Sequence, residues 1–235
     1  MSKFLCICLS STIQRTVNFK KLSLEGVNRS ESYILDASGK AVNSARVLNQ
    51  LEPGCVSIIC PLGKENKNDF LELAQKDELD VLAVEIPGKT RECWTLLDRS
   101  YGTTTELVVG EPVLSEDYKI SEEVLLSLIG KKLPEFDGVI LAGSCPDYFS
   151  PGLQATVARL VVESGKTFLA DYCGSELVRT LELCTPPVIK INEEEFCRTF
   201  GLSGFIDEAH LKRSVSAKSR ELNNAIIVTR GKNYT

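Results

Sequence analysis

Short apolar runs recur along the 235-residue chain and predict buried strands. They are Phe4–Leu9, Val56–Cys60, Val81–Ile86, Gly138–Ala142, Thr167–Asp171, Val188–Ile191 and Ala225–Thr229. Most of them are separated by segments with helical spacing of apolar residues, namely Ala41–Leu51, Asp69–Gln75, Glu122–Lys132, Leu153–Ser164, Glu193–Phe200 and Glu208–Leu222. This alternation predicts an α/β fold, a three-layer, Rossmann-like arrangement of a mostly parallel sheet with helices on both faces. Ligands of such sheets bind beyond the carboxyl ends of the strands.

Two segments depart from this rhythm. Residues 15–36 and 90–109 are polar, rich in threonine and aromatic residues, and alternate as strands do. Ser100-Tyr101-Gly102 is a turn signal inside the second segment. We expect one domain over residues 1–235, with a small projecting sheet, a lid, formed from about residues 10–36 and 88–111. The alternative is two surface hairpins without function.

Composition narrows the class of protein. Hydrophobic residues make up 43% of the chain and charged residues 25%, which is typical of a globular protein. A net charge of −5 argues against general attraction to nucleic acid or to an anionic membrane. Nine cysteines without a CxxC pair indicate reduced thiols in a cytoplasmic protein. The only histidine, His210, excludes a multi-histidine zinc site, and we expect it on a helix surface.

Familiar nucleotide motifs are absent or incomplete. Ala83–Thr90 ends in GKT, but alanine occupies the first glycine position of a Walker A loop and a strand follows. Gly165-Lys166-Thr167 has the same fault. Neither is therefore expected to bind phosphate in the manner of a P-loop. The chain also lacks a GxGxxG sequence, which leaves an unrelated dehydrogenase as a distant option.

Small or polar residues follow several predicted strands. Lys40 stands at the start of a helix, where free N–H groups favour an anion. Asn192 and Glu195 are three residues apart at another helix start, so they can point the same way. They equally fit a capping box with no other role. Together with the small residues after Ala142 and Asp171, these strand ends outline a ligand-binding rim.

The order of the motifs resembles the ribokinase-like (PfkB) carbohydrate kinases, in particular the branch with 1-phosphofructokinase and tagatose-6-phosphate kinase. DASGKAVNSARVLNQL is similar to the D-A-G-G-K-G-x-N-x-A-R-x-L signature of that branch, and GKTRECWTLLD to its T-R-x-N strand. LAGSCP resembles S-G-S-L-P, DYCGSEL resembles D-x-S-G-E-x-L, and KINEEE resembles K-P-N-x-x-E. CLSSTIQRTVNF, TTELVVGEP and VTRG resemble further motifs in the same order.

The resemblance implies phosphoryl transfer from ATP, with Mg²⁺, to a hydroxyl of a sugar or sugar phosphate. Lys40 and Arg91 correspond to cations that contact the phosphate of the acceptor, which favours a phosphorylated acceptor such as fructose-1-phosphate or tagatose-6-phosphate. By the same resemblance, the acceptor site comprises Gln14, Gly39, Lys40, Asn43, Arg91 and Ser144, and the ATP site comprises Lys190, Asn192, Thr229 and Gly231. Asn192 and Glu195 would organise the metal.

Some positions depart from the pattern of the family. Gln14 replaces a sugar-binding aspartate and loses a charge-assisted contact. Ser38 and Ala41 replace two glycines of the GGKG motif, so their Cβ atoms are expected to crowd the ligand or to exclude a positive φ. Cys93 replaces an asparagine. In place of the N-E-P-G turn stands Val108-Val109-Gly110-Glu111. The acceptor pocket is therefore expected to differ from that of the branch.

The G-A-G-D motif, whose aspartate is the general base of the family, would lie beyond Thr235. We therefore expect the sequence to be part of a longer chain or its tail to be unrecorded. A second hypothesis is a relative that binds a sugar phosphate or a nucleotide without turnover, as a sensor or an interaction protein. The lid strands are further expected to offer a surface for a homodimer.

Overall fold

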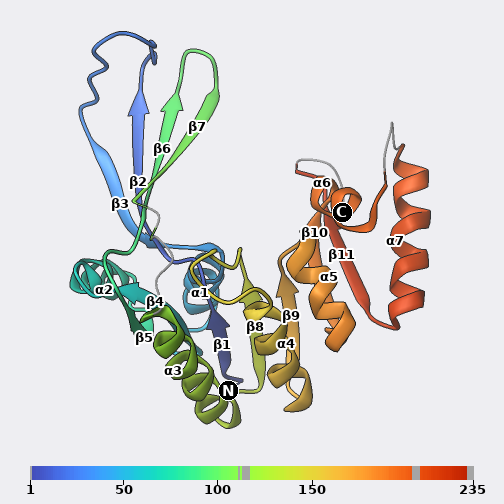
Figure 1. Ribbon diagram of the computed structural model, residues 1–235. Coiled ribbons are helices and arrows are strands. Elements are labelled where there is room, and N and C mark those ends of the chain that lie inside the picture. Colours follow the sequence, from blue (N-terminus) through green and yellow to red (C-terminus); the bar gives the residue numbers. More distant parts are fainter. Residues whose placement is uncertain (1, 111, 113–116, 203–206, 232–235) are drawn as a thin grey trace.

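The computed structural model describes residues 2–110, 112, 117–202 and 207–231, and its centre is a parallel sheet (Figure 1). Its strand order is β11-β10-β9-β8-β1-β4-β5. The strands are β1 (Phe4–Ile7), β4 (Val56–Gly63), β5 (Asp80–Ile86), β8 (Gly138–Ala142), β9 (Thr167–Asp171), β10 (Val188–Asn192) and β11 (Ala225–Thr229). The chain starts in β1, moves outward through β4 and β5, and returns to β8 on the other side of β1. Such a reversal of strand order makes a crevice at the carboxyl ends.

All seven predicted strands are present, with small differences at their ends. β1 ends at Ile7 rather than Leu9, because the chain there leaves the sheet toward the lid. β4 continues to Gly63, where it still pairs with β5. The helices are α1 (Lys40–Leu51), α2 (Lys67–Lys76), α3 (Asp117–Lys132), α4 (Leu153–Glu163), α5 (Gly174–Leu183), α6 (Glu193–Phe200) and α7 (Glu208–Leu222), and a short 3-10 helix covers Leu133–Glu135. α5 has no counterpart among the predicted helices.

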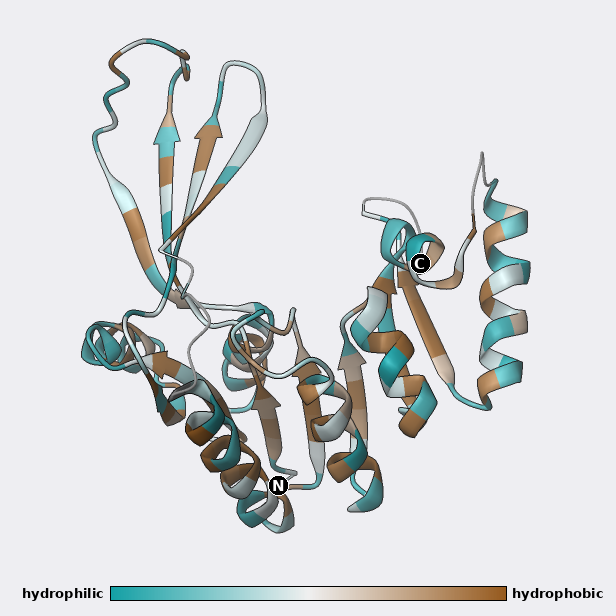
Figure 2. Cartoon of the chain, viewed as in Figure 1, coloured by the Kyte–Doolittle hydropathy of each residue, from teal (hydrophilic) through white to brown (hydrophobic). Residues whose placement is uncertain are grey.

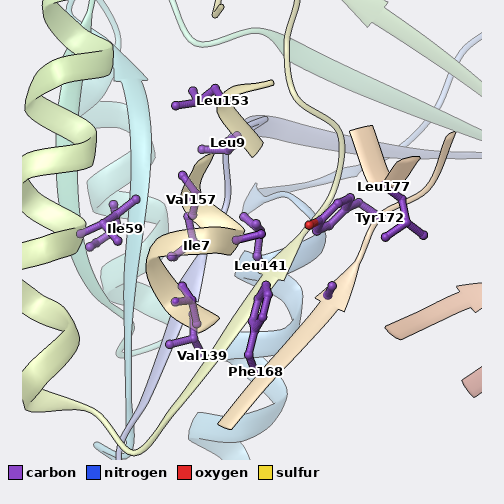
Figure 3. Close-up of a cluster of buried hydrophobic side chains, with 14 of the residues drawn as sticks. Ile7, Leu9, Ile59, Val139, Leu141, Leu153, Val157, Phe168, Tyr172 and Leu177 are labelled. Carbon is purple, nitrogen blue, oxygen red and sulfur yellow. The ribbon is translucent and has the colours of Figure 1, made fainter. Parts of the chain in front are cut away.

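Apolar side chains on the two faces of the sheet form two separate cores. On one face, Cys6, Cys8 and Cys60 pack with α1 and α2, whose Phe70 is fully buried. On the other face, side chains of α3, α4 and α5 pack on the strands, and Figure 3 shows Phe168, Leu141 and Val157 among them. The strands are accordingly brown and the outer helix surfaces largely teal in Figure 2. Helices on both faces confirm the predicted three-layer architecture.

The lid is a separate four-stranded sheet with the order β3-β2-β6-β7. Its strands are β2 (Thr12–Phe19), β3 (Tyr33–Ser38), β6 (Glu92–Asp98) and β7 (Thr103–Val109). β6 and β7 form an antiparallel hairpin around the predicted Ser100–Gly102 turn, whereas β2 and β6 run parallel. In Figure 1 this sheet rises beyond the carboxyl ends of β1 and β4. Of the departures noted in the sequence, Glu111 lies outside the described residues.

Two further expectations concern single residue types. All nine cysteines are free thiols, five of them buried. His210 is exposed on α7, and its backbone N–H donates to the N-cap Asp207. Within the described ranges, no helix combines the length and apolar character needed to cross a bilayer.

Candidate functional site

A pocket of about 480 Å³ lies where the lid meets the carboxyl ends of β1, β8 and β9. The main domain contributes the N-terminus of α1, the loop after β8 and the loop after β9, while β2, β6 and β7 contribute from the lid. The predicted residues that line it are Gln14, Gly39, Lys40, Asn43, Arg91, Ser144 and Glu195. The whole predicted acceptor set thus shares one cavity.

The first turn of α1 comes close to the end of β1 because Gly39 has no side chain. Its φ is 137°, and an added Cβ would lie 2.5 Å from the Sγ atom of Cys8. Ser38 and Ala41 are not among the described residues with positive φ. The expected exclusion of a positive φ therefore has no bearing on these two positions, since the turn requires that conformation only at Gly39. Ser38 instead donates a hydrogen bond to Asn43 Oδ1 over 3.3 Å.

Lys40 connects two parts of the site. Its Nζ atom lies 3.4 Å from Asp171 Oδ1 and 3.4 Å from Glu195 Oε1. Burial alone lowers the pKa of Lys40, but the negative charges of Asp171 and Glu195 outweigh it, so the pKa is raised. Lys190 Nζ approaches the second oxygen of Asp171 at 2.8 Å. The buried Asp171 carboxylate is therefore held between two ammonium groups and fixes both.

The start of α6 forms a capping box, which was one of the two interpretations that the sequence allowed. Asn192 Oδ1 accepts from Glu195 N at 2.8 Å, and Glu195 Oε2 accepts from Asn192 N at 2.9 Å. Burial raises the pKa of Glu195, yet the backbone N–H of Asn192 and the charge of Lys40 prevail, and the pKa is lowered. Glu195 is thus both a cap and an ion-pair partner of Lys40, so the capping box is not the only contact of its carboxylate.

The predicted ATP-site residues lie outside the pocket, along the neighbouring strand ends. Asn192 ends β10 and pairs in register with Thr229, the last residue of β11. Gly231 follows with a φ of 60°. Between them, Arg230 is fixed by Glu193 Oε2 at 2.9 Å and Glu208 Oε2 at 3.2 Å. The structure therefore places these residues side by side on the rim, next to the pocket that Lys40 and Glu195 line.

The lid contributes polar groups from one face of its sheet. Gln14 pairs with Cys93 in register, and Gln14 Nε2 donates to Thr95 Oγ1 at 2.6 Å. Arg91 precedes β6, and its Nη2 donates to the backbone oxygen of Ser10 at 3.4 Å. Burial raises the pKa of Cys93, and the charge of Glu106 adds to this shift. The amide of Gln14 is thus oriented by the lid itself.

Several residues that line the pocket were not among the predicted site residues. Glu106 reaches the pocket from β7, directly opposite Thr95 in the hairpin register. The register of a hairpin around Ser100–Gly102 contained this signal, because residues opposite each other share a face. Gln154 lines the pocket from α4, and its Nε2 donates to Gly143 O at 2.9 Å. Nothing in the sequence indicated that Gln154 lines a pocket, since a polar residue near the start of a helix is common.

The site is charged but has no preformed metal cage. Two cations, Lys40 and Arg91, and three carboxylates, Glu106, Glu176 and Glu195, line the pocket. Among the described residues, no cluster of three or more histidine, cysteine or acidic side chains is arranged to hold a metal ion. Mg²⁺ commonly binds through substrate phosphates, waters and one or two carboxylates. Glu195 fits that mode, and Asn192 Oδ1 retains a second lone pair beside its capping bond.

A family model and several relatives match the sequence of this chain. Residues 3–233 match the model of the pfkB family of carbohydrate kinases. The chain is 27% identical over 213 residues to a tagatose-6-phosphate kinase of Staphylococcus epidermidis, an alignment that covers 90% of this chain and 67% of the relative. It is 28% identical over 199 residues to a 1-phosphofructokinase of Vibrio cholerae, covering 85% and 61%. The chain thus spans about two thirds of the length of these relatives.

Solved structures share the fold. Phosphofructokinase-2 from Escherichia coli in complex with fructose-6-phosphate superposes with a TM-score of 0.82 at 16% identity, covering 98% of this chain and 75% of that one. A protein of Thermotoga maritima described as a possible 1-phosphofructokinase gives a TM-score of 0.82 at 18% identity, covering 97% and 72%. The family match over nearly all residues, the ribokinase-like fold and the clustered motif residues lead to one conclusion: the chain belongs to the pfkB family of carbohydrate kinases.

Proposed function

We propose that the pocket binds a sugar phosphate and that the rim beside it binds ATP, so that the γ-phosphate passes to a hydroxyl of the sugar. The observation that carries this proposal is the position of Lys40. Its ammonium group lies at the boundary of the pocket and the rim, within 3.4 Å of both Asp171 and Glu195. Phosphoryl transfer relies mainly on positioning and charge neutralisation, which a cation at that boundary supplies.

On the acceptor side, Lys40 and Arg91 hold the phosphate of the sugar, and Gln14, Asn43 and Ser144 bind its hydroxyls. Asn43 Oδ1 is already used by Arg46 Nη1 at 2.6 Å, which leaves the amide nitrogen of Asn43 to donate to the ligand. Fructose-1-phosphate and tagatose-6-phosphate are the acceptors that we propose, in line with the names of the two relatives. Gly39 contributes its backbone rather than a side chain.

On the donor side, Lys190, Asn192, Thr229 and Gly231 are proposed to surround the ATP phosphates. Mg²⁺, held mainly by those phosphates and by Glu195, would neutralise charge on the triphosphate. The capping box keeps Glu195 oriented, since each of its two residues fixes the other. The family resemblance assigns the general base to the aspartate of a G-A-G-D motif, and we propose no general base among the 235 residues. The test uses the product of the encoding gene.

The decisive experiment measures ADP release with a panel of acceptors that includes fructose-1-phosphate, tagatose-6-phosphate and the corresponding free sugars. We expect turnover of a phosphorylated acceptor and a large increase in KM for it when Arg91→Met removes a phosphate contact. Turnover of the free sugar at an equal rate would contradict the role of the two cations. Ligand-dependent thermal shifts without any turnover would support the sensor hypothesis instead.

We also propose that two copies of the chain form a homodimer through the lid. All seven residues of β7 are exposed, and Tyr33, Trp94 and Leu107 expose apolar surface on the lid. Exposed strand edges with apolar side chains favour pairing with another copy. We expect light scattering after gel filtration to give a dimer mass, which Leu107→Lys lowers toward that of a monomer. A monomeric wild-type protein at micromolar concentration would contradict this proposal.

A further inference from the structure

A second pocket lies at the far end of the lid. It has a volume of about 330 Å³ and is lined by Asn18, Lys20, Lys21, Arg29, Ser30, Glu31, Ser32 and Arg99. None of these residues lines the pocket proposed for the sugar phosphate. The two pockets occupy opposite ends of the same strands, because β2 and β6 pair in parallel from Ile13 and Glu92 to Phe19 and Asp98.

The lining of this lid-tip pocket is strongly cationic. Lys20, Lys21, Arg29 and Arg99 contribute four positive charges against the single carboxylate of Glu31, in a chain whose net charge is −5. Within the described residues, no carboxylate forms an ion pair with any of the four cations. Four like charges around one cavity repel each other, and a bound anion relieves that repulsion.

The pocket is held in place by hydrogen bonds rather than by apolar packing. Asp98 accepts from the backbone N–H groups of Leu22 at 2.9 Å and Ser100 at 2.8 Å, which joins the loop after β2 to the turn after β6. Ser30 Oγ donates to the backbone oxygens of Asn18 and Ser32, each at 2.8 Å. The cations therefore project from three segments that are tied together at their bases.

We infer that the lid-tip pocket is a binding site for a small anion that bears two or more phosphate groups. Arginine binds phosphate through two parallel N–H groups and lysine adds point charge, so two of each suit a polyphosphate. The volume is near the lower end of the range for small-molecule sites. A bound polyphosphate would bridge residues 20–32 to the β6–β7 turn and stiffen the lid. The inference does not depend on the proposed kinase activity.

The test is a calorimetric titration of the full-length chain with tripolyphosphate at low salt. The background is Arg91→Met/Lys190→Met, because these changes weaken phosphate binding in the other pocket and at the proposed donor site. We expect the additional double variant Arg29→Ser/Arg99→Ser to raise the Kd at least about tenfold, since each 1.4 kcal/mol of lost contact corresponds to one factor of ten. The matched control Lys76→Ser/Lys131→Ser removes the same charge from exposed helix positions and should change the Kd by less than about twofold.

Hydrogen exchange supplies a second readout. Tripolyphosphate should slow amide exchange in residues 20–32 and 99–102 of the background protein, but not after Arg29 and Arg99 are replaced. Titrations with a nucleoside triphosphate and with a sugar bisphosphate then distinguish the two sources of the phosphate groups. Equal weakening by both double variants would show only a general charge effect and overturn the inference. Absence of binding up to millimolar tripolyphosphate would overturn it as well.

Discussion

The main sheet and the lid meet at one pocket, but they hold their side chains in different ways. At the rim of the main sheet, Asp171 is buried and fixes Lys40 and Lys190 by ion pairs. In the lid, β7 has no buried residue, and Glu106 reaches the pocket from an exposed strand. The rim is therefore preorganised by a packed core, whereas the lid keeps its shape mainly through strand pairing and a few polar contacts. The difference indicates that stability resides in the sheet and adaptability in the lid.

The largest expected effect separates the two regions by stability. Phe168→Ala removes a fully buried ring from the core under β9, which should lower the free energy of unfolding by about 3–5 kcal/mol. Leu24→Ala in the loop between β2 and β3, where the side chain is 91% exposed, is the control on the lid and should change it by less than about 0.5 kcal/mol. Urea unfolding followed by circular dichroism measures both. A comparable loss in the two variants would mean that the lid is as tightly integrated as the sheet.

The next prediction concerns the cation at the boundary of the two regions. Lys40→Met should lower kcat/KM for the sugar phosphate by about 10²–10³-fold, the typical loss when one group that stabilises the transition state is removed. Lys67→Met is the matched control, because Lys67 pairs with Glu85, outside the pocket. Steady-state kinetics with the full-length gene product gives both values. A loss of less than tenfold for Lys40→Met would place the phosphate contacts elsewhere.

A smaller effect is expected from the capping box at the rim. Asn192→Ala removes the acceptor for Glu195 N and should destabilise the protein by about 1 kcal/mol. Asn192→Asp keeps a capping oxygen and should cost less. The urea midpoint compares the three proteins. If Asn192→Ala leaves stability unchanged but lowers activity, the residue serves the donor site and contributes nothing as a cap.

The smallest expected effect is the change of stability with pH that arises from the charged groups of the rim. The pKa of Glu195 in the folded protein lies below its ordinary value of 4.5, so the folded state binds its proton less readily than the unfolded state. Its stabilisation is therefore present above about pH 4.5 and is lost as the pH falls through the lowered pKa. The stability difference between the wild type and Glu195→Gln should shrink with acidification in urea titrations. A constant difference over that range would contradict the ion pair with Lys40.

The stability that Lys40 contributes depends on pH in the opposite sense, because the pKa of Lys40 is raised above the ordinary value of 10.5. Its contribution is complete below that value and is lost as the pH rises through the raised pKa. The two ends of the stability profile therefore report on the same ion pair.

The sequence alone determined most of the local structure of this protein, although not the helix α5. Short runs such as Thr167–Asp171 and Ala225–Thr229 match β9 and β11 at both ends, because β-branched and apolar runs can be buried in few other ways. The hairpin turn at Ser100–Gly102 also followed from local chemistry. The family resemblance then brought together the acceptor residues, since their motifs follow the strand ends in order.

The tertiary structure alone decided which of these strand ends meet and what they do to each other. Lys40 and Glu195 are 155 residues apart, and they pair because the order of the strands reverses at β1. Local spacing fixes the direction of a side chain but not the order of strands in a sheet, so this contact was not predictable from the sequence. The lid-tip pocket likewise depends on the tertiary structure. Its cations are unremarkable in the sequence and form a site only because parallel pairing of β2 and β6 brings their ends together.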